Sequence, residues 1–173
     1  MANLKEIRNR IASVSSTMQI TSAMKMVSAA KLKKAQDAIT AMRPYANKLT
    51  ELIQNLSSSL DGEGQNPYTV QRAEEKILII AITSNRGLCG AFNTNIIKET
   101  LRIAKEDYAE KTVEVMGIGK KGGDILSKTL PVRSRHDAVY DDLNFGNTTE
   151  VALQAMDAFA KGEYDKVLVV YNQ

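Results

Sequence analysis

A glycine-rich segment is the first candidate for chemistry in this chain. Gly117-Ile118-Gly119-Lys120-Lys121-Gly122 has the spacing GxGxxG, and Asp142 follows 20 residues after Gly122. In dinucleotide-binding proteins such glycines let a helix N-terminus approach a pyrophosphate, and an acidic residue further on binds the ribose. Glycines at a strand-to-helix turn also serve backbone conformation alone. A tight turn is the favoured interpretation, because this is the second such turn of its domain and a short helix follows it.

The second candidate is the loop Thr83–Asn95, which contains the single cysteine, Cys89. A nucleophilic cysteine needs a neighbouring base. The only histidine, His136, lies 47 residues further along the chain. Catalysis is therefore disfavoured, and the glycines predict a rigid loop that presents Arg86 to another protein. One cysteine forms neither an internal disulfide nor, by itself, a zinc site, which fits a reducing compartment.

The hydrophobic pattern after Lys76 predicts the strands and helices that would position both loops. Strands alternate there with helices, which predicts a mostly parallel, doubly wound α/β sheet with right-handed crossovers. The last helix is expected to be capped by Asn147. The chain stops at Gln173, directly after a strand, which suggests truncation. The predicted strands lie at 77–83, 112–118, within 131–139 and at 166–171, and the predicted helices at 94–108, 123–129 and 148–161.

The first third of the chain carries a different repeat. Sixteen positions alternate in steps of three and four from Leu4 to Leu56, and thirteen of them are apolar. This pattern predicts a long helix, capped by Asn3, that supercoils around a partner helix. Pro44 is expected to bend this helix without dividing it. The residues assigned to the coiled-coil seam are Leu4, Ile7, Ile11, Val14, Leu32, Ile39, Leu49, Ile53 and Leu56.

Charge is distributed unevenly along the chain. Residues 1–56 hold nine Lys or Arg against three Asp or Glu, whereas the rest of the chain holds fourteen against seventeen. A basic helix of this kind could bind nucleic acid, an acidic membrane surface or an acidic protein collar. The alternative is that its charged side chains form an ordinary solvent-exposed face. Within it, Ala12–Met24 carries no charge. Such a smooth segment predicts enclosure by other protein on every side.

Composition sets the remaining bounds. The chain has 173 residues, of which 43% are hydrophobic and 25% charged, as in ordinary soluble proteins. It has no apolar run of the roughly 20 residues that a membrane helix needs, and no signal-peptide pattern follows Met1. The expected domains are a helix at 1–57, a linker at 58–75 and an α/β domain at 76–173.

Four segments carry a resemblance to a known family. They are Leu4-Lys5-Glu6-Ile7-Arg8-Asn9-Arg10-Ile11, Thr21-Ser22-Ala23-Met24-Lys25-Met26-Val27-Ser28-Ala29-Ala30-Lys31, Arg43-Pro44-Tyr45 and Arg86-Gly87-Leu88-Cys89-Gly90. Together they strongly resemble the gamma subunits of F-type ATP synthases, in order and over the whole chain. Asn85 and Ala91 depart from the usual Asp and Gly of that family.

The resemblance implies a non-catalytic rotor shaft without a cofactor. It implies a Rossmann-like α/β domain, a C-terminal helix that would pair with the seam, and partners in the alpha, beta and epsilon subunits and the membrane c-ring. Without that helix the seam predicts self-association. It also implies a peripheral position at the cytoplasmic face of a bacterial membrane. The implied contacts with the alpha/beta ring are Arg8, Arg10, Met18, Ile20, Met24, Lys25, Lys31, Arg86, Gly87, Leu88, Cys89 and Gly90.

Two alternatives come from other functional classes. A nucleotide-binding module would use the GxGxxG turn, and would bind NAD(P) or ATP. A basic coiled-coil protein that binds nucleic acid would show a steep dependence on salt. The long helix has few aromatic side chains for base stacking, and Tyr45 is the exception.

Overall fold

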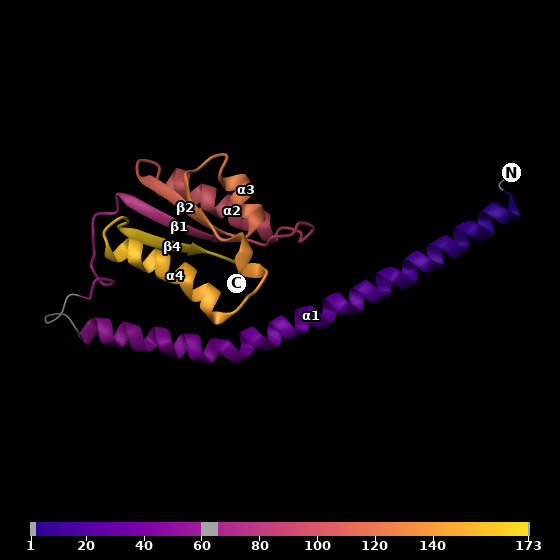
Figure 1. Ribbon diagram of the computed structural model, residues 1–173, viewed down its shortest axis with the longest axis horizontal. Coiled ribbons are helices and arrows are strands. Elements are labelled where there is room, and N and C mark those ends of the chain that lie inside the picture. The colour runs from indigo at the N-terminus through magenta and orange to yellow at the C-terminus, as the bar shows by residue number, and fades with distance from the viewer. Residues whose placement is uncertain (1–2, 60–65, 173) are drawn as a thin grey trace. The chain divides into compact units, whose positions relative to one another are not determined.

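The computed structural model describes residues 3–59 and 66–172. The chain divides into two units, Met1–Gly64 and Gln65–Gln173, and each is considered by itself (Figure 1). No helix within the described ranges is both long and apolar enough to cross a bilayer.

The first unit contains one helix, α1 (Leu4–Ser59). Its sequence is rich in Ala, Met, Leu and Lys and holds no glycine, which favours a continuous helix. The side chain of Asn3 accepts a hydrogen bond from the amide of Lys5 at 3.1 Å, as expected of a cap. Pro44 lies inside the helix without ending it. The helix is bent rather than straight (Figure 1).

The second unit is built on a four-stranded parallel sheet with the order β3-β2-β1-β4. The strands are β1 (Lys76–Ile82), β2 (Thr112–Ile118), β3 (Val132–Arg135) and β4 (Lys166–Val170). Strand β1 is central and pairs with β2 from Lys76↔Thr112 to Ile82↔Ile118. The predicted α/β class with a mostly parallel sheet is confirmed.

Helices cover both faces of the sheet (Figure 1). On one face lie α2 (Phe92–Arg102), continued by a π-helical turn at Ile103–Asp107, and α3 (Lys120–Leu126). On the other face lies α4 (Phe145–Ala160). The two buried clusters follow this division: Ile77, Ile79, Val115, Ile96, Ile97 and Leu126 on the first face, and Leu78, Met116, Val151, Ala155, Ala158 and Tyr164 on the second.

Strand β1 lies at the centre of the sheet, and most of its residues are buried. Residues Ile77–Ala81 are all buried, because a central parallel strand is covered on both faces and alternates its side chains between them. The sequence Ile77-Leu78-Ile79-Ile80-Ala81 therefore reads as a continuous apolar run rather than as an alternating one.

Several element boundaries differ from the sequence-based expectations. Helix α2 begins at Phe92 and gives way to the π-helical turn after Arg102. Helix α4 begins three residues before the expected start, and Asn147 is not its cap. The cap is Asn144, whose side chain accepts a hydrogen bond from the amide of Asn147 at 2.9 Å. Both asparagines precede the same apolar pattern, so the pattern alone could not choose between them.

Candidate functional site

The GxGxxG segment connects β2 to α3, and its backbone amides already have protein acceptors. Lys120 donates from its amide to Oδ1 of Asn85 at 2.9 Å, and Lys121 donates to the carbonyl of Ser84 at 3.1 Å. Gly122 donates to Oγ1 of Thr83 at 2.9 Å. A phosphate at this turn would have to displace three hydrogen bonds from the segment after β1.

The glycines of this segment are explained by close packing against Thr83. Gly119 has a φ of 95°, and a Cβ there would lie 2.2 Å from the Thr83 carbonyl oxygen. A Cβ on Gly122 would lie 2.6 Å from Oγ1 of Thr83. Asp142, the acid that might bind a ribose, accepts a hydrogen bond from Nδ2 of Asn144 at 2.8 Å beside the cap of α4. These contacts support the tight-turn interpretation.

The loop after β1, residues 84–91, is the most elaborate feature at this edge of the sheet. Asn93, on α2, is buried beneath it. Its Oδ1 accepts from the amide of Ser84 at 2.9 Å, and its Nδ2 donates to Oγ of Ser84 at 2.9 Å. The hydroxyl of Ser84 also donates to the carbonyl of Arg86 at 2.6 Å. One carboxamide thus ties the start of the loop to the helix that follows it.

A second anchor runs from the loop to the other side of the edge. Asn85 donates from Nδ2 to the carbonyl of Asp137 at 2.8 Å while its Oδ1 accepts from Lys120. The resemblance noted in the sequence implies an Asp at this position in most of the family. An Asp at this position could accept from Lys120 but could not donate to Asp137, so the departure adds a tie between the loop and the segment after β3.

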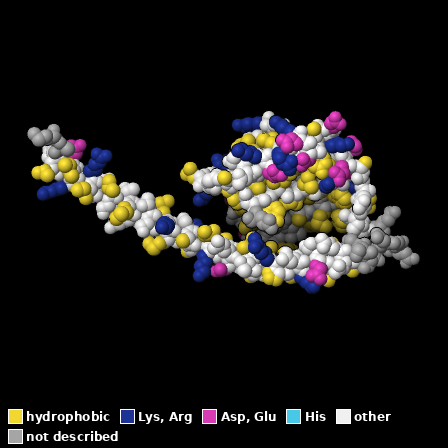
Figure 2. Space-filling view, turned by 180° about the vertical axis from the view of Figure 1, so that it is seen from behind, with side chains coloured by type: hydrophobic (Ala, Val, Ile, Leu, Met, Phe, Trp, Pro, Cys, Tyr) yellow, Lys and Arg dark blue, Asp and Glu magenta, His cyan; other side chains and the backbone are white. Residues whose placement is uncertain are grey.

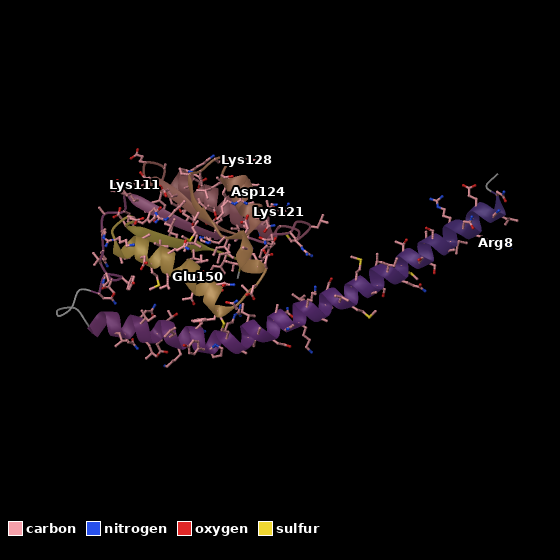
Figure 3. The ribbon with its side chains drawn as sticks, in the orientation of Figure 1. Arg8, Lys111, Lys121, Asp124, Lys128 and Glu150 are labelled. Atoms are coloured by element: carbon pink, nitrogen blue, oxygen red, sulfur yellow. The ribbon has the colours of Figure 1, made fainter. Side chains whose placement is uncertain are left out.

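Residues Arg86–Gly90 form the projecting tip of the loop, and all five are exposed. Leu88 adopts a left-handed backbone with a φ of 60°, and Gly90 has a φ of 59°. Lys121 lies close by, since a Cβ on Gly87 would sit 3.7 Å from its Cε. Lys121 and Asp124 both belong to α3, beside this loop (Figure 3).

Cys89 and His136 make hydrogen bonds to different partners. The Sγ of Cys89 lies 3.2 Å from Nδ2 of Asn93. His136 is half-buried, its Nε2 lies 3.0 Å from Oγ of Ser134, and burial lowers its pKa below the usual value. Among the described residues, no hydrogen bond joins Cys89 to His136.

Carboxylates near the loop are paired with one arginine. Nη2 of Arg135 lies 2.8 Å from Oδ1 of Asp124 and 2.8 Å from Oδ2 of Asp137. The hydrogen bond from Arg135 lowers the pKa of Asp124. One arginine balances the charge of only one carboxylate, and the positive charges of Lys120 and Lys121 also lower the pKa of Asp124. Together with the exposed Arg86, these cations give the surroundings of the loop tip an excess of positive charge.

Helix α1 carries the other expected contact residues, and each of them is exposed. Its uncharged segment has a further property that sequence reasoning missed. The hydroxyl of Thr17 donates to the carbonyl of Ser13 at 2.9 Å, and that of Thr21 donates to the carbonyl of Thr17 at 2.9 Å. These hydroxyls turn back on the helix, so the threonines present methyl groups outward. The contact residues on α1 are Arg8, Arg10, Met18, Ile20, Met24, Lys25 and Lys31.

The seam residues lie on α1 without cover. Every side chain from Asn3 to Leu56 is exposed, and the seam residues range from 43% exposed at Ile7 to 74% at Leu4. Figure 2 shows hydrophobic side chains along the length of this helix. Among the described residues of the first unit, α1 is the only helix, so nothing described in that unit covers the seam.

A groove of about 810 Å³ lies beside α4 in the second unit. Its apolar lining includes Ile80, Met156 and Phe159. Arg72 donates to the carbonyl of Phe159 at 2.9 Å and stacks over that ring at 4.8 Å, and Lys166 pairs with Glu74 at 2.7 Å. The charged groups at its edge are therefore engaged in structural contacts.

Metal chemistry has no support in the described residues. Within 3–59 and 66–172, no group of three or more His, Cys, Asp or Glu side chains is placed to hold a metal ion. The described residues offer two exposed features: the loop Arg86–Gly90 on the second unit and the apolar helix α1 on the first. Exposed apolar side chains of this kind are typical of surfaces that bind other protein.

Comparison with known proteins identifies the family of this chain. A family model described as ATP synthase matches residues 3–173, and the chain belongs to this family. Its curated relatives are ATP synthase gamma chains. Identity is 66% over 173 residues with that of Flavobacterium psychrophilum and 65% with that of Flavobacterium johnsoniae, in each case over 100% of this chain. The chain spans 60% of the length of these relatives.

A solved structure supports the same assignment. The chain is similar to one from the central stalk and c-ring of the Tetrahymena thermophila mitochondrial ATP synthase, with a TM-score of 0.66 and 26% identity. The similarity covers 89% of this chain and 65% of that one. More distant relatives include the gamma chain of Geotalea daltonii, which is 43% identical over 173 residues.

Proposed function

We propose that this chain forms part of the central rotor shaft of a bacterial F-type ATP synthase. It would transmit torque between an ion-driven ring in the membrane and a catalytic ring of alpha and beta subunits. The observation that carries the proposal is the 66% identity to an ATP synthase gamma chain across the whole of this chain. The exposed apolar helix α1 supports it independently, because such a helix requires protein partners.

The surfaces of α1 suggest how the shaft would be held. The seam would pair with a C-terminal helix, for which the greater length of the relatives leaves room. The uncharged segment Ala12–Met24, in which the hydroxyls of Thr17 and Thr21 bond to the helix backbone, would turn inside the alpha/beta ring as a bearing. Lys25 and Lys31 begin a basic zone that would face acidic lever segments of the beta subunits.

The second unit would serve as the foot of the shaft. It would contact the epsilon subunit and the c-ring, and the loop Arg86–Gly90 would form a second contact with the beta levers. Three anchors, Thr83, Asn85 and Asn93, hold that loop in one conformation. A rigid loop suits this role because a lever transmits force only through parts that do not yield.

Coupling would arise from contacts that differ between positions of the shaft. A bent shaft presents a different face to each beta subunit as it turns, and each face favours a different conformation of that subunit. A ligand or a contact shifts an equilibrium only through its different affinity for the two states. This chain would perform no bond chemistry and would lie at the cytoplasmic face of the membrane as a peripheral part of the complex.

The test is reconstitution with alpha and beta subunits. This chain and a version extended to the length of its relatives are each mixed with the two subunits, and co-elution and ATP hydrolysis are followed. We expect the extended version to assemble and stimulate hydrolysis, and this chain to do so weakly. Failure of both versions to bind the ring would overturn the proposal, and binding of NAD(P), ATP or DNA would then be measured.

A further inference from the structure

Leu88 combines two features that are unfavourable in the isolated fold. It is the one non-glycine residue with a positive φ among residues 3–59 and 66–172, and its side chain is fully exposed. We propose that Leu88 is an apolar anchor, held in place before binding, that inserts into a socket bordered by carboxylates on the partner subunit. This inference rests on the proposed function and specifies how the loop Arg86–Gly90 would make its contact.

The backbone conformation is the first observation. A left-handed conformation brings the Cβ of an L-residue close to the following carbonyl oxygen, and glycine or asparagine adopts it more readily than leucine. Gly90, two residues on, has a φ of 59° without this penalty. Strained residues persist where the surrounding structure fixes them, and they cluster at sites of contact and binding.

The surrounding hydrogen bonds do fix this loop. Asn93 and Ser84 hold its start, Asn85 ties it to Asp137 and Lys120, and the amide of Phe92 donates to the carbonyl of Cys89 at 3.3 Å at its end. The tip is thus presented in one conformation. An anchor that is ordered before binding loses less conformational entropy when it binds.

The chemistry of the tip defines the partner. The side chain of Leu88 is apolar, and the exposed cations of Arg86, Lys120 and Lys121 lie in the same loop or at the start of the adjacent helix. The nearby carboxylates Asp124 and Asp137 are both paired with Arg135. The complementary surface is therefore an apolar recess, wide enough for one leucine, with Asp or Glu side chains at its rim.

Three variants of the native-length chain in a complex with alpha and beta subunits test this role. Leu88→Asn tolerates the left-handed backbone but removes the apolar side chain. Leu88→Met keeps an apolar side chain of similar length and is the matched control. Leu88→Gly removes both the side chain and the strain. Two quantities are measured for each variant, the melting temperature of the free chain and its rate of dissociation from the ring.

An anchor and a structural residue give opposite results. For an anchor, Leu88→Asn and Leu88→Gly leave the melting temperature unchanged or higher. They also speed dissociation roughly tenfold or more, since most affinity differences appear in the dissociation rate and a buried leucine is worth one to two decades. Leu88→Met stays near the wild-type rate. A lower melting temperature with an unchanged dissociation rate would overturn the inference.

The controls separate this inference from the proposed function. If the wild-type chain fails to bind the ring at all, the proposed function is wrong. If the wild-type chain binds and Leu88→Asn dissociates at the wild-type rate, only the anchor is wrong.

A separate experiment identifies the partner surface, with a photoreactive leucine analogue at position 88. We expect the crosslinked peptide to contain apolar residues flanked by Asp or Glu, and a peptide without carboxylates would contradict the socket.

Discussion

Thr83 and Asn93 are buried polar side chains on which the edge of the sheet depends. Thr83 donates from its hydroxyl to the carbonyl of Gly119 at 3.1 Å and accepts from the amide of Gly122. Asn93 uses both ends of its carboxamide on Ser84. Buried polar groups favour folding only when their hydrogen bonds are satisfied. These two residues therefore fix the loops rather than merely filling space.

Gly119 provides the sharpest test of the close approach. In Gly119→Ala the new Cβ would meet the Thr83 carbonyl at 2.2 Å in a backbone with a φ of 95°. We expect a loss of about 2–6 kcal/mol in the free energy of unfolding, from strain and overpacking together. The control is Gly162→Ala, where φ is 76° but no atom lies within 4 Å of the new Cβ. That variant should lose only about 1–2 kcal/mol. Equal losses in denaturant titrations would show that packing against Thr83 is unimportant.

Asn93 is predicted to control the order of the loop. Replacing it with Ala leaves the amide of Ser84 without its acceptor, and should cost about 1–3 kcal/mol of stability. Amide exchange in residues 84–91 should accelerate more than exchange in β1. Asn95→Ala is the control, because Asn95 lies on the same helix and is exposed. If Asn93→Ala leaves loop exchange at the Asn95→Ala level, the loop is held by other contacts.

His136 predicts a pH dependence of stability. Burial lowers its pKa below the usual 6.5 in the folded chain, so the unfolded chain binds more protons below that pH. The contribution of neutral His136 to the free energy of unfolding is therefore fully present above pH 6.5. It is lost as the pH falls toward the pKa of the folded state. The carboxyls of Asp124 and Glu74 have lowered pKa values as well, from 3.8 and 4.5, and act only at lower pH. Melting temperatures between pH 7.5 and 5 should fall less for His136→Gln than for wild type, and identical slopes would refute the assignment.

At the scale of elements, we expect α1 to depend on partners for its stability. An apolar seam exposed to water leaves the favourable burial of its leucines and isoleucines unrealised, and helical stability in proteins comes mainly from packing of such a face. We expect the chain to self-associate through this seam when other partners are absent.

A pair of charge substitutions tests the seam. Ile11→Asp with Val14→Asp places two carboxylates on the seam, and should shift the chain toward monomer in sedimentation experiments. It should also lower the melting temperature of the assembled complex. The control, Ser13→Asp with Ser16→Asp, introduces the same charges at the same spacing but off the seam. If both pairs reduce association equally, net charge rather than the seam is responsible.

Most elements of the second unit could be predicted from the sequence. The four strands appear where apolar runs predicted them, because central parallel strands are apolar on both faces. The cap of α4 and the start of α2 could not be located, because Asn144 and Asn147 are both suitable caps and Phe92 follows a glycine-rich loop. The π-helical turn at Ile103–Asp107 continues the hydrophobic pattern of α2, and periodicity does not distinguish the two.

The candidate site was only partly readable from the sequence. The exposure of Arg86–Gly90 was expected from its glycines. The tight turn at the GxGxxG glycines was also the favoured prediction, but their close packing against Thr83, 36 residues earlier in the chain, was not foreseen. The left-handed conformation of Leu88 also left no signal, since leucine rarely adopts it. The packing of the glycines and the conformation of Leu88 depend on contacts made in the folded chain. The types of the neighbouring residues in the sequence do not predict them.

At the scale of the whole molecule, the two units divide both charge and structure. Residues 1–56 carry a formal charge of +6, whereas the remainder carries −3. The first unit exposes its apolar residues, whereas the second has a buried apolar cluster on each face of its sheet, beneath the helices. A helix that needs partners, joined to a domain that is folded around its own core, is the arrangement expected of a shaft with a foot.

Rotation is the most direct test of that account. The native-length chain, with Cys89→Ser and a single attachment cysteine introduced by Lys128→Cys on the exposed surface of the second unit, is assembled into an immobilised ring of alpha and beta subunits. A bead bound to that cysteine reports its motion when ATP is added. We predict unidirectional rotation that depends on ATP and stops when ATP is removed. A bead that stays fixed on a ring that hydrolyses ATP would contradict the role of this chain as the rotor shaft.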